Sequence, residues 1–374
     1  MNAGRLPGLR RIPPLMRRVD PDVVLFNSWG GRVADNPRAV AEELRRRDAP
    51  LEHVWVLAEG SQAPEGATVV RPGSVAHLEQ LGRARYIVSS NVLPGYFRKK
   101  RATSYLQTWH GTPLKRIAFD MPDPRFAAGT RRYFAMLERE IANWDFLVSP
   151  NGFSTEVLRR AFRYNGEIVE TGYPRNDVLS APDRDVVRAR VREELGLAEG
   201  VCAVLYAPTW RDDASFSTEL DLPRMAAGLG DGYAILLRAH KAVAATVAVD
   251  GGGGVLNVSD RDDVAELFLA ADVLITDYSS VMFDFAVTRK PMLFFTYDLA
   301  YYRDELRGFY LDLEREAPGP LIDDAGDLVD ALRDVDRVRA EHDDAYERFR
   351  RRFCHLEDGR AAQRVVDAFF GAAV

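Results

Sequence analysis

The stretch VLITDYSSVMFDFAVTRKPMLFF, residues 273–295, contains the structural unit that decides the fold. It begins with an apolar run of strand length (273–276) and passes through a polar turn into a segment with helical spacing (281–288). A second apolar run, at 292–295, follows the helix. Such runs are typical of parallel strands that are buried on both faces. A helix between two of them predicts a βαβ unit in a parallel sheet.

The same alternation extends outward from this unit in both directions. Further runs of strand length lie at 23–27 (VVLFN), 54–58 (VWVLA), 86–89 (YIVS), 146–149 (FLVS), 203–206 (AVLY) and 234–238 (AILLR). Helices are predicted at 37–47 with Asn36 as N-cap, at 74–83 with Ser74 as N-cap, and at 185–195, where Gly196 ends the helix. The sequence therefore predicts an α/β protein of two Rossmann-like domains, whose parallel sheets face an interdomain cleft.

The 374 residues are sufficient for two domains of ordinary size, each with its own core. The two series of strands predict an N-terminal domain over 1–180 and a C-terminal domain over 181–358. The remaining segment, 359–374, begins with a helical pattern over 359–370 and is expected to cross back onto the first domain.

The composition is that of a folded protein, with 47% apolar and 28% charged residues. A net charge of −6 argues against a protein that coats nucleic acid, and no nucleic-acid partner is expected. The two cysteines lie far apart and are expected to be reduced thiols. No apolar run approaches the ~20 residues that span a bilayer. The N-terminus lacks the apolar core of a signal peptide, so secretion is not expected.

Two basic clusters contrast with the acidic background. One contains Arg5, Arg10, Arg11, Arg17 and Arg18, and the other is RKKR at 98–101. These clusters are interpreted either as contacts for anionic headgroups or a polyanionic acceptor, or as a solvated tail and a solvated loop.

Polar residues directly follow several of the predicted strands. Because ligands of open parallel sheets bind beyond the carboxyl ends of the strands, these residues are the candidates for function. Ser279 and Ser280 begin the helix of the opening stretch, where hydroxyls and free amides favour phosphate, and Asp284 is placed to accept hydrogen bonds from a ribose. The alternative is that the serines only cap the helix and that Asp284 interacts with its dipole.

Two further strand ends carry cationic side chains. Thr209 and Arg211 follow the run at 203–206, and Arg238, His240 and Lys241 follow the run at 234–238. A hydroxyl and guanidinium groups suit phosphate, so these residues predict a diphosphate pocket. A structural arginine paired with a carboxylate, and a histidine buried in the core, are the alternatives.

The fourth strand-end group surrounds His110 in the first domain. Gly111 follows it and allows close approach of a ligand, and an imidazole with a pKa near 6.5 takes a proton at neutral pH. A loop histidine without a role is the alternative. The acidic pairs at 212–213 and 262–263 lack a third ligand of evident spacing, so no metal or other cofactor is expected. The P-loop and nucleophile-elbow motifs are absent from the sequence.

These motifs, in this order, resemble the CDP-glycerol glycerophosphotransferases of teichoic acid and capsule synthesis. The matching segments are QTWHGTPLK (107–115), TGYPRND (171–177), YAPTWR (206–211), RAHK (238–241), TDYSSVMFDFA (276–286) and FFTYDLAYYRDELRGFYLDLEREAPGP (294–320). The resemblance covers residues 85–360. Lys241 departs from it, because the family commonly has proline after this histidine.

The resemblance implies a GT-B fold and a CDP-glycerol or other CDP-alcohol donor, with glycerol and ribitol both open. It also implies a polyprenyl-diphosphate-linked acceptor and a peripheral location on the cytoplasmic face of the cell membrane. His110 corresponds to the catalytic base, and His240 to a second essential histidine near the donor diphosphate. Six residues correspond to positions around the donor's phosphates and ribose: Thr209, Arg211, Arg238, Ser279, Ser280 and Asp284.

Two other functions remain open. A GT-B glycosyltransferase that uses a nucleotide sugar would need the same anion pocket, but it would release a nucleoside diphosphate instead of CMP. A non-catalytic scaffold on the membrane surface would turn over no donor.

Overall fold

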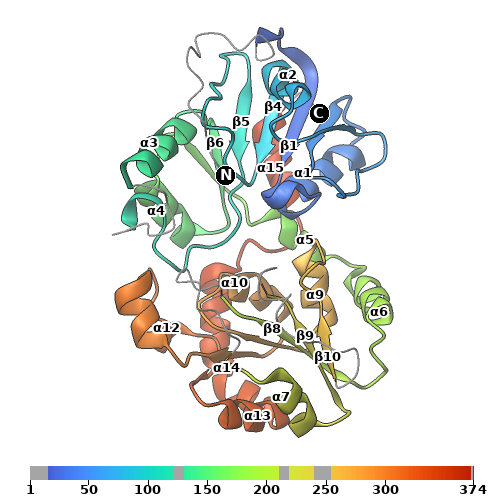
Figure 1. Ribbon diagram of the computed structural model, residues 1–374, viewed down its shortest axis with the longest axis vertical. Helices are drawn as coiled ribbons and strands as arrows, with labels where there is room; N and C mark the ends of the chain where they lie inside the picture. Colours follow the sequence, from blue (N-terminus) through green and yellow to red (C-terminus); the bar gives the residue numbers. More distant parts are fainter. Residues whose placement is uncertain (1–15, 122–129, 210–218, 240–253, 372–373) are drawn as a thin grey trace.

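Two parallel sheets, one above the other in Figure 1, organise the computed structural model, which describes residues 16–121, 130–209, 219–239, 254–371 and 374. The first sheet has seven strands in the order β3-β2-β1-β4-β5-β6-β7, and the second has six in the order β10-β9-β8-β11-β12-β13. All pairings within them are parallel. The predicted α/β class with two parallel sheets is confirmed.

The chain order reverses once in each sheet. The strands of the first sheet are β1 (Asp20–Asn27), β2 (Glu52–Val56), β3 (Thr68–Val70), β4 (Ala84–Ser89), β5 (Ser104–Gln107), β6 (Phe146–Ser149) and β7 (Glu167–Glu170). Those of the second are β8 (Cys202–Ala207), β9 (Tyr233–Leu237), β10 (Val255–Asn257), β11 (Val273–Thr276), β12 (Met292–Phe295) and β13 (Leu321–Ile322). The reversals lie between β1 and β4 and between β8 and β11, and ligands of such sheets bind at these points.

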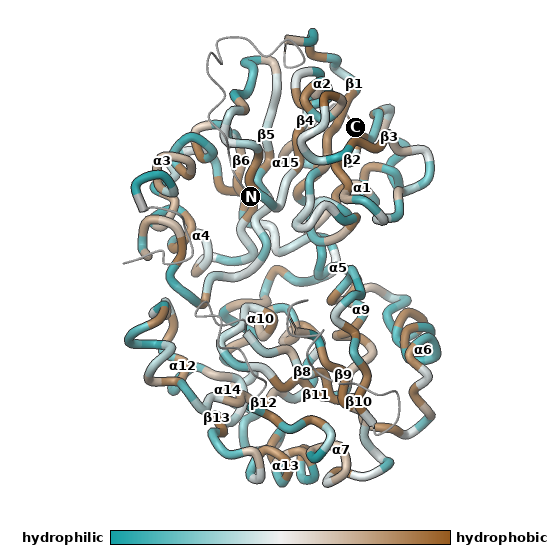
Figure 2. Tube along the Cα trace, viewed as in Figure 1, coloured by the Kyte–Doolittle hydropathy of each residue, from teal (hydrophilic) through white to brown (hydrophobic). Residues whose placement is uncertain are grey.

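Helices cover both sheets. They are α1 (Asp35–Arg46), α2 (Val75–Arg83), α3 (Thr130–Ile141), α4 (Gly152–Ala161), α5 (Asp177–Ser180), α6 (Arg184–Glu194), α7 (Leu222–Leu229), α9 (Val264–Ala270), α10 (Val281–Phe285), α11 (Leu299–Tyr301), α12 (Leu313–Glu316), α13 (Ala325–Arg333), α14 (Val335–Phe353) and α15 (Ala361–Phe370). Short 3-10 and π turns are η2 (Trp29–Gly31), η3 (Ala118–Asp120), η4 (Pro174–Asn176), η5 (Ala286–Thr288) and η6 (Tyr302–Leu306). Hydrophobic and hydrophilic residues alternate along α6 and α13 in Figure 2, as expected of helices with one apolar face.

The helix boundaries confirm two sequence predictions and correct one. The Ser74 side chain accepts from the His77 amide and caps α2, and Gly196 adopts a φ of +67° just after α6. Asn36 is not the N-cap of α1, because the helix begins at Asp35 and Ala34 is in the capping position. The buried Asn36 amide donates instead to the carbonyls of Thr108 and Trp109, so it is used in tertiary contacts.

The last helix returns to the first sheet. Val365, Val366 and Phe369 of α15 pack in one apolar cluster with Val24 and Phe26 of β1. The first turn of α15 is held by Asp177, whose two carboxylate oxygens each accept an amide, from Ala361 and Ala362, at 2.8 Å. The C-terminal end of the described chain is therefore part of the core of the first half.

Gly172 lies where this returning segment passes the strand end of β7. Its φ is +81°, and a Cβ built there would lie 2.8 Å from the Leu356 carbonyl oxygen. We expect Gly172→Ala to lower the free energy of unfolding by ~1–2 kcal/mol through left-handed backbone strain and by a further ~1–3 kcal/mol through overpacking. Urea denaturation measures the change. Gly196→Ala is the matched control, because Gly196 also has a positive φ but nothing within 4 Å of its Cβ position. An equal loss in the two variants would contradict the close approach.

Candidate functional site

The carboxyl ends of the two sheets face each other across a cavity of about 1400 Å³. Its wall contains residues that follow β1, β2 and β5 in the first half and β9 and β10 in the second. Among them are Trp29, Glu59, His110, Arg175, Arg238 and Asp263. The cavity therefore lies at the edge where open parallel sheets bind ligands, and both halves contribute to it.

His110 lies in the loop that follows β5, and one of its ring nitrogens is anchored. Nδ1 is 2.9 Å from the carbonyl oxygen of Ser90, the residue that follows β4. A carbonyl only accepts hydrogen bonds, so Nδ1 carries the proton and Nε2 of the neutral ring keeps its lone pair. The rings of Trp109 and Trp29 flank the imidazole, with centroids 4.2 and 5.7 Å away. The site thus presents a neutral imidazole in a fixed orientation.

The surroundings of His110 favour this neutral form. Burial lowers its pKa below the ordinary value, and the positive charge of Arg175 acts in the same direction. The negative charge of Asp35 and the hydrogen bond with Ser90 oppose them. A histidine whose pKa is lowered remains able to accept a proton at neutral pH.

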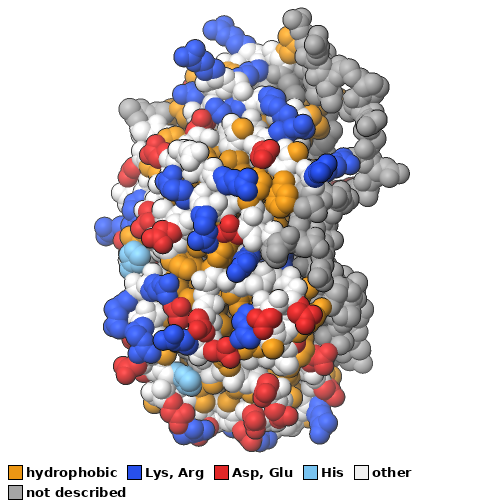
Figure 3. Space-filling model, turned by 90° about the vertical axis from the view of Figure 1, so that its left-hand side faces the viewer, with side chains coloured by type: hydrophobic (Ala, Val, Ile, Leu, Met, Phe, Trp, Pro, Cys, Tyr) orange, Lys and Arg blue, Asp and Glu red, His pale blue; other side chains and the backbone are white. Residues whose placement is uncertain are grey.

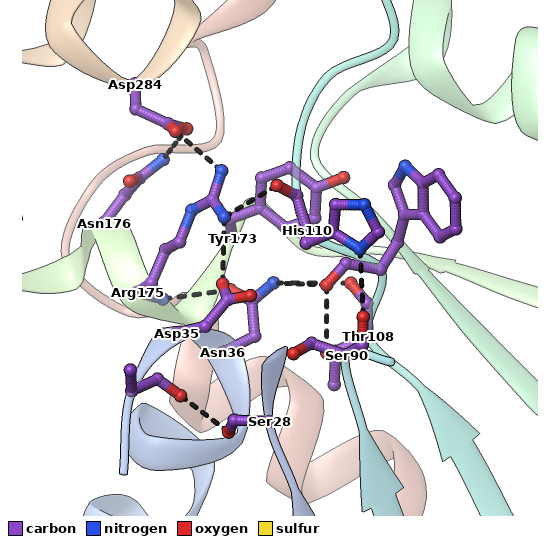
Figure 4. A network of polar contacts seen from close by, with 12 residues as sticks. Ser28, Asp35, Asn36, Ser90, Thr108, His110, Tyr173, Arg175, Asn176 and Asp284 are labelled. Carbon is purple, nitrogen blue, oxygen red and sulfur yellow. Dashed lines mark hydrogen bonds and ion pairs between the residues drawn. The ribbon is translucent and has the colours of Figure 1, made fainter. Parts of the chain in front are cut away.

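Arg175, in η4, connects the His110 loop with both halves of the molecule (Figure 4). Its Nη1 donates to the His110 carbonyl oxygen at 2.8 Å and to Asp35 Oδ1, at the start of α1, at 2.9 Å. Its Nη2 donates to Asp284 Oδ2, in α10, at 2.6 Å. Asn176 donates to the other oxygen of Asp284 at 2.9 Å. Burial disfavours the charge of Arg175, but Asp284 and Asp35 outweigh this effect and raise its pKa.

The two halves also meet directly beside His110. A Cβ built on Gly111 would lie 2.8 Å from the Ser280 side-chain oxygen. A larger residue at position 111 would require the Ser280 side chain to move. Ser280, in the N-cap position of α10, is therefore adjacent to the His110 loop, with Ser279 next to it in the chain.

Arg238 is the other predicted site residue that lines the cavity. Its Nη1 donates to the carbonyl oxygen of Arg261 at 2.8 Å, and in the described part of the chain it forms no ion pair. Burial lowers the pKa of Arg238, and the negative charges of Asp263 and Asp262 offset part of this effect. A half-buried guanidinium held by neutral acceptors favours an anion as its partner.

The other predicted site residues have different positions. Thr209 is buried, and its amide donates to Asp277 Oδ1 at 2.8 Å. Asp284 is buried too, 3% exposed, and its two oxygens face Arg175 and Asn176 instead of the cavity. His240 and Arg211 lie outside the described residues. Their roles, and those of Thr209, Ser279 and Ser280, stay predictions.

The acidic pair at 262–263, which was considered as a metal site, forms ion pairs between the halves. Asp262 pairs with Arg32 at 2.5 Å, and Asp263 pairs with Arg38 at 2.8 Å. Both arginines belong to the first half, and both carboxylates to the second. Arg32, Asp262 and Asp263 line the cavity.

The RKKR cluster at 98–101 is only partly exposed. Lys99 pairs with Asp145 at 3.1 Å, and Lys100 donates to the carbonyl oxygens of Arg17 and Gly82. Arg98 and Arg101 remain exposed. On the face drawn in Figure 3, basic and acidic side chains are interspersed. Within the described ranges, no helix has the length and apolar character needed to cross a bilayer.

Several residues of the site were not predicted from the sequence. Asn36, Ser90 and Arg175 bind the His110 loop directly. Asp35 binds Arg175, and Asn176 binds Asp284. Arg175 and Asn176 belong to the TGYPRND segment, which carried the resemblance but received no role. Ser90 directly follows a predicted strand, so the strand-end rule was able to indicate it.

Three comparisons place this fold and site among known proteins. Residues 12–371 match the family model described as CDP-Glycerol:Poly(glycerophosphate) glycerophosphotransferase. A teichoic acid glycerol-phosphate transferase of Staphylococcus aureus is 37% identical over 95% of this chain and 95% of its own length. A teichoic acid poly(glycerol phosphate) polymerase of Bacillus subtilis is 37% identical over the whole chain, which spans half the length of that relative.

A solved structure of the wall teichoic acid polymerase TagF, soaked with CDPG, has the same fold. It is 36% identical, with a TM-score of 0.90 over 95% of this chain and 90% of its own. The match extends over both halves, which confirms the predicted GT-B architecture.

Proposed function

Because the chain belongs to the CDP-glycerol:poly(glycerophosphate) glycerophosphotransferase family, we propose that it transfers glycerol phosphate from CDP-glycerol to an acceptor hydroxyl and releases CMP. The observation that carries the proposal is His110, with Nδ1 anchored and Nε2 able to accept a proton, in a cavity shared with the half-buried Arg238 cation. A base and an anion-binding cation at one cavity are the groups that this transfer needs.

In the proposed reaction the acceptor hydroxyl loses its proton to Nε2 of His110. Its oxygen attacks the distal phosphorus of CDP-glycerol, and the bond from this phosphorus to the bridging oxygen breaks. CMP leaves with the bridging oxygen and its electron pair. Arg238 stabilises negative charge on the phosphoryl oxygens as it develops.

The donor half of the proposal extends to residues whose roles rest on the family resemblance. His240 and Arg211 are assigned to the diphosphate, with Thr209 and the serines 279 and 280 around the phosphates. Ser280 adjoins the His110 loop at Gly111, which supports the assignment for this residue. We assign no metal or cofactor to the reaction.

The acceptor and the location are also proposals. The relatives are named as teichoic acid enzymes, and the family resemblance implies a polyprenyl-diphosphate-linked acceptor at the cytoplasmic face of the membrane. Exposed Arg98 and Arg101 support a peripheral contact with anionic headgroups.

The function is tested by incubating the chain with CDP-glycerol, CDP-ribitol and a nucleotide sugar, each with a lipid-linked glycerol phosphate acceptor. We expect CMP release with CDP-glycerol, one glycerol phosphate added per CMP, and unchanged rates with EDTA. A nucleoside diphosphate released from the nucleotide sugar would favour a glycosyltransferase instead. Absence of turnover with every donor would favour the scaffold.

The lowered pKa of His110 predicts the pH dependence of the reaction. A general base works only when it is neutral, so kcat/KM falls as the pH falls through the pKa of His110. Because burial lowers this pKa below its ordinary value of 6.5, we expect the acid limb of the profile below pH 6.5. Initial rates of CMP release from pH 4.5 to 8.5 give the profile. An acid limb above pH 6.5 would contradict a buried histidine base.

A further inference from the structure

One guanidinium, that of Arg175, binds three segments that are distant in the sequence. Its acceptors are the His110 carbonyl in the loop after β5, Asp35 in α1 and Asp284 in α10. Figure 4 shows these acceptors arranged around the guanidinium group. The side chains of Arg175, Asp35 and Asp284 are largely buried: the exposed fractions of their side-chain surfaces are 13%, 13% and 5%. The rigid planar fork of arginine makes this arrangement possible, whereas a lysine has one nitrogen to offer.

We propose that Arg175 is a positioning residue for the transfer reaction, and that Asp284 acts by holding Arg175 instead of binding the donor's ribose. This inference rests on the proposed function, because the reaction is needed to measure it. It changes the expectation for Asp284, whose two carboxylate oxygens receive hydrogen bonds from Arg175 and Asn176.

The backbone next to His110 explains why such a residue is needed. Trp109 has a φ of +54°, in the left-handed region that a bulky residue rarely adopts. A backbone of this kind persists only where the surrounding contacts hold it. Here Asn36 binds the Trp109 carbonyl at 3.2 Å, and Arg175 binds the His110 carbonyl. Arg175 also donates its own amide to Asn36 Oδ1 at 3.1 Å, so the two residues act together.

Arg175 and Asp35 are the charged groups that face His110 and shift its pKa, in opposite directions. Arg175 comes from η4 and Asp35 from α1. Loss of the arginine leaves the negative charge of Asp35 uncompensated and stabilises the imidazolium. Loss of the Asp35 charge removes the carboxylate that raises the pKa of His110, and so destabilises the imidazolium.

The first test compares Arg175→Gln with Arg175→Lys, using CMP release from CDP-glycerol. We expect Arg175→Gln to lower kcat by at least about tenfold, because a displacement of the reacting group by ~1 Å can cost up to 10²-fold. The KM for CDP-glycerol is expected to stay within about twofold. Arg175→Lys should recover only part of kcat, because a single nitrogen cannot reach all three acceptors. Wild-type kcat in Arg175→Gln would overturn the proposal.

The pH profile separates positioning from a general loss of stability. The acid limb of kcat/KM should move to higher pH in Arg175→Gln and to lower pH in Asp35→Asn. Arg188→Gln is the matched structural control: Arg188 binds the carbonyls of residues 269–271 and pairs with Asp272, far from the cavity wall. It should lower the melting temperature and leave the acid limb in place. Limbs that do not move in the Arg175 and Asp35 variants would overturn the proposal.

Asp284→Asn decides between the two roles for Asp284. If Asp284 holds Arg175, Asp284→Asn should lower kcat and leave the KM for CDP-glycerol unchanged. If Asp284 binds the ribose, the variant should raise that KM. A raised KM with unchanged kcat would overturn the proposal.

The double variant Arg175→Gln/Asp284→Asn completes the test. Arg175→Gln leaves the carboxylates of Asp284 and Asp35 without their arginine partner, so removing the charge of Asp284 as well should restore part of the lost thermal stability. We expect the melting temperature to rise from that of Arg175→Gln while kcat stays low, since the His110 carbonyl still lacks its donor. If the melting temperature and kcat both recovered in the double variant, the only role of Arg175 would be to neutralise Asp284. Because the proposed function predicts CMP release by the wild-type chain, its failure is visible in that sample and is distinct from these outcomes.

Discussion

Replacing His110 with alanine is expected to lower turnover by about 10²–10⁴-fold, the range that general base catalysis contributes. Nδ1 of this histidine is anchored on the Ser90 carbonyl, so the group lost is Nε2, the atom that we propose takes the proton of the acceptor hydroxyl. Because the base acts on the acceptor, the Kd for CDP-glycerol should remain close to that of the wild type. The rate of CMP release and calorimetric titration with CDP-glycerol measure the two quantities.

His342→Ala is the matched control for this loss. His342 lies in α14, remote from the large cavity, and its removal should leave the rate of CMP release unchanged. A His110→Ala variant that keeps the full rate would show that another group takes the proton. A large rise in the Kd for CDP-glycerol would show that His110 belongs to the donor site instead.

Replacing Arg238 with glutamine is expected to weaken CDP-glycerol binding by about 10- to 100-fold. A hydrogen bond to a charged group contributes about 1.5–3 kcal/mol, and ~1.4 kcal/mol corresponds to a tenfold change in Kd. Arg238 is suited to this role because it is half-buried at the cavity wall and its guanidinium is held by the carbonyl of Arg261. Calorimetric titration with CDP-glycerol and with CMP measures the loss.

The comparison of CDP-glycerol with CMP shows whether Arg238 binds the distal phosphate. If Arg238 binds the distal phosphate, its loss should weaken CDP-glycerol more than CMP, which lacks that phosphate. Arg337→Gln is the control, since Arg337 pairs on the outer surface of α14 with Asp334 and Glu341. An unchanged Kd for both ligands in Arg238→Gln would exclude Arg238 from the donor site.

The fold was predictable where the chain forms long apolar runs. The unit at 273–295 has strand bounds at 273–276 and 292–295 in the structure, as the sequence predicts. Five strands, β3, β5, β7, β10 and β13, were not predicted, because each contains only two consecutive apolar residues. One of them, β5, leads directly into the His110 loop. Because this strand was not predicted, His110 was identified from its motif.

The site was predictable only for side chains that follow strands. His110 and Arg238 satisfy that rule, and both line the cavity. Arg175 follows no strand end directly, and its importance comes from three acceptors brought together by tertiary structure. Asp284 was expected to face a ribose, but a carboxylate in the first turn of a helix has the same sequence pattern whether it meets a ligand or an arginine. The choice depends on how the two halves pack.

The central claim is that an acceptor hydroxyl attacks the distal phosphorus of CDP-glycerol and displaces CMP. The most direct measurement uses an acceptor with an ¹⁸O-labelled terminal hydroxyl and follows the label by ³¹P NMR and mass spectrometry. We predict that ¹⁸O appears in the new phosphodiester, with one unlabelled CMP released per label transferred. Release of CDP would place the attack at a carbon of the glycerol. Release of glycerol phosphate, with a cytidylyl group on the labelled oxygen, would place it at the proximal phosphorus, and either result would contradict the account.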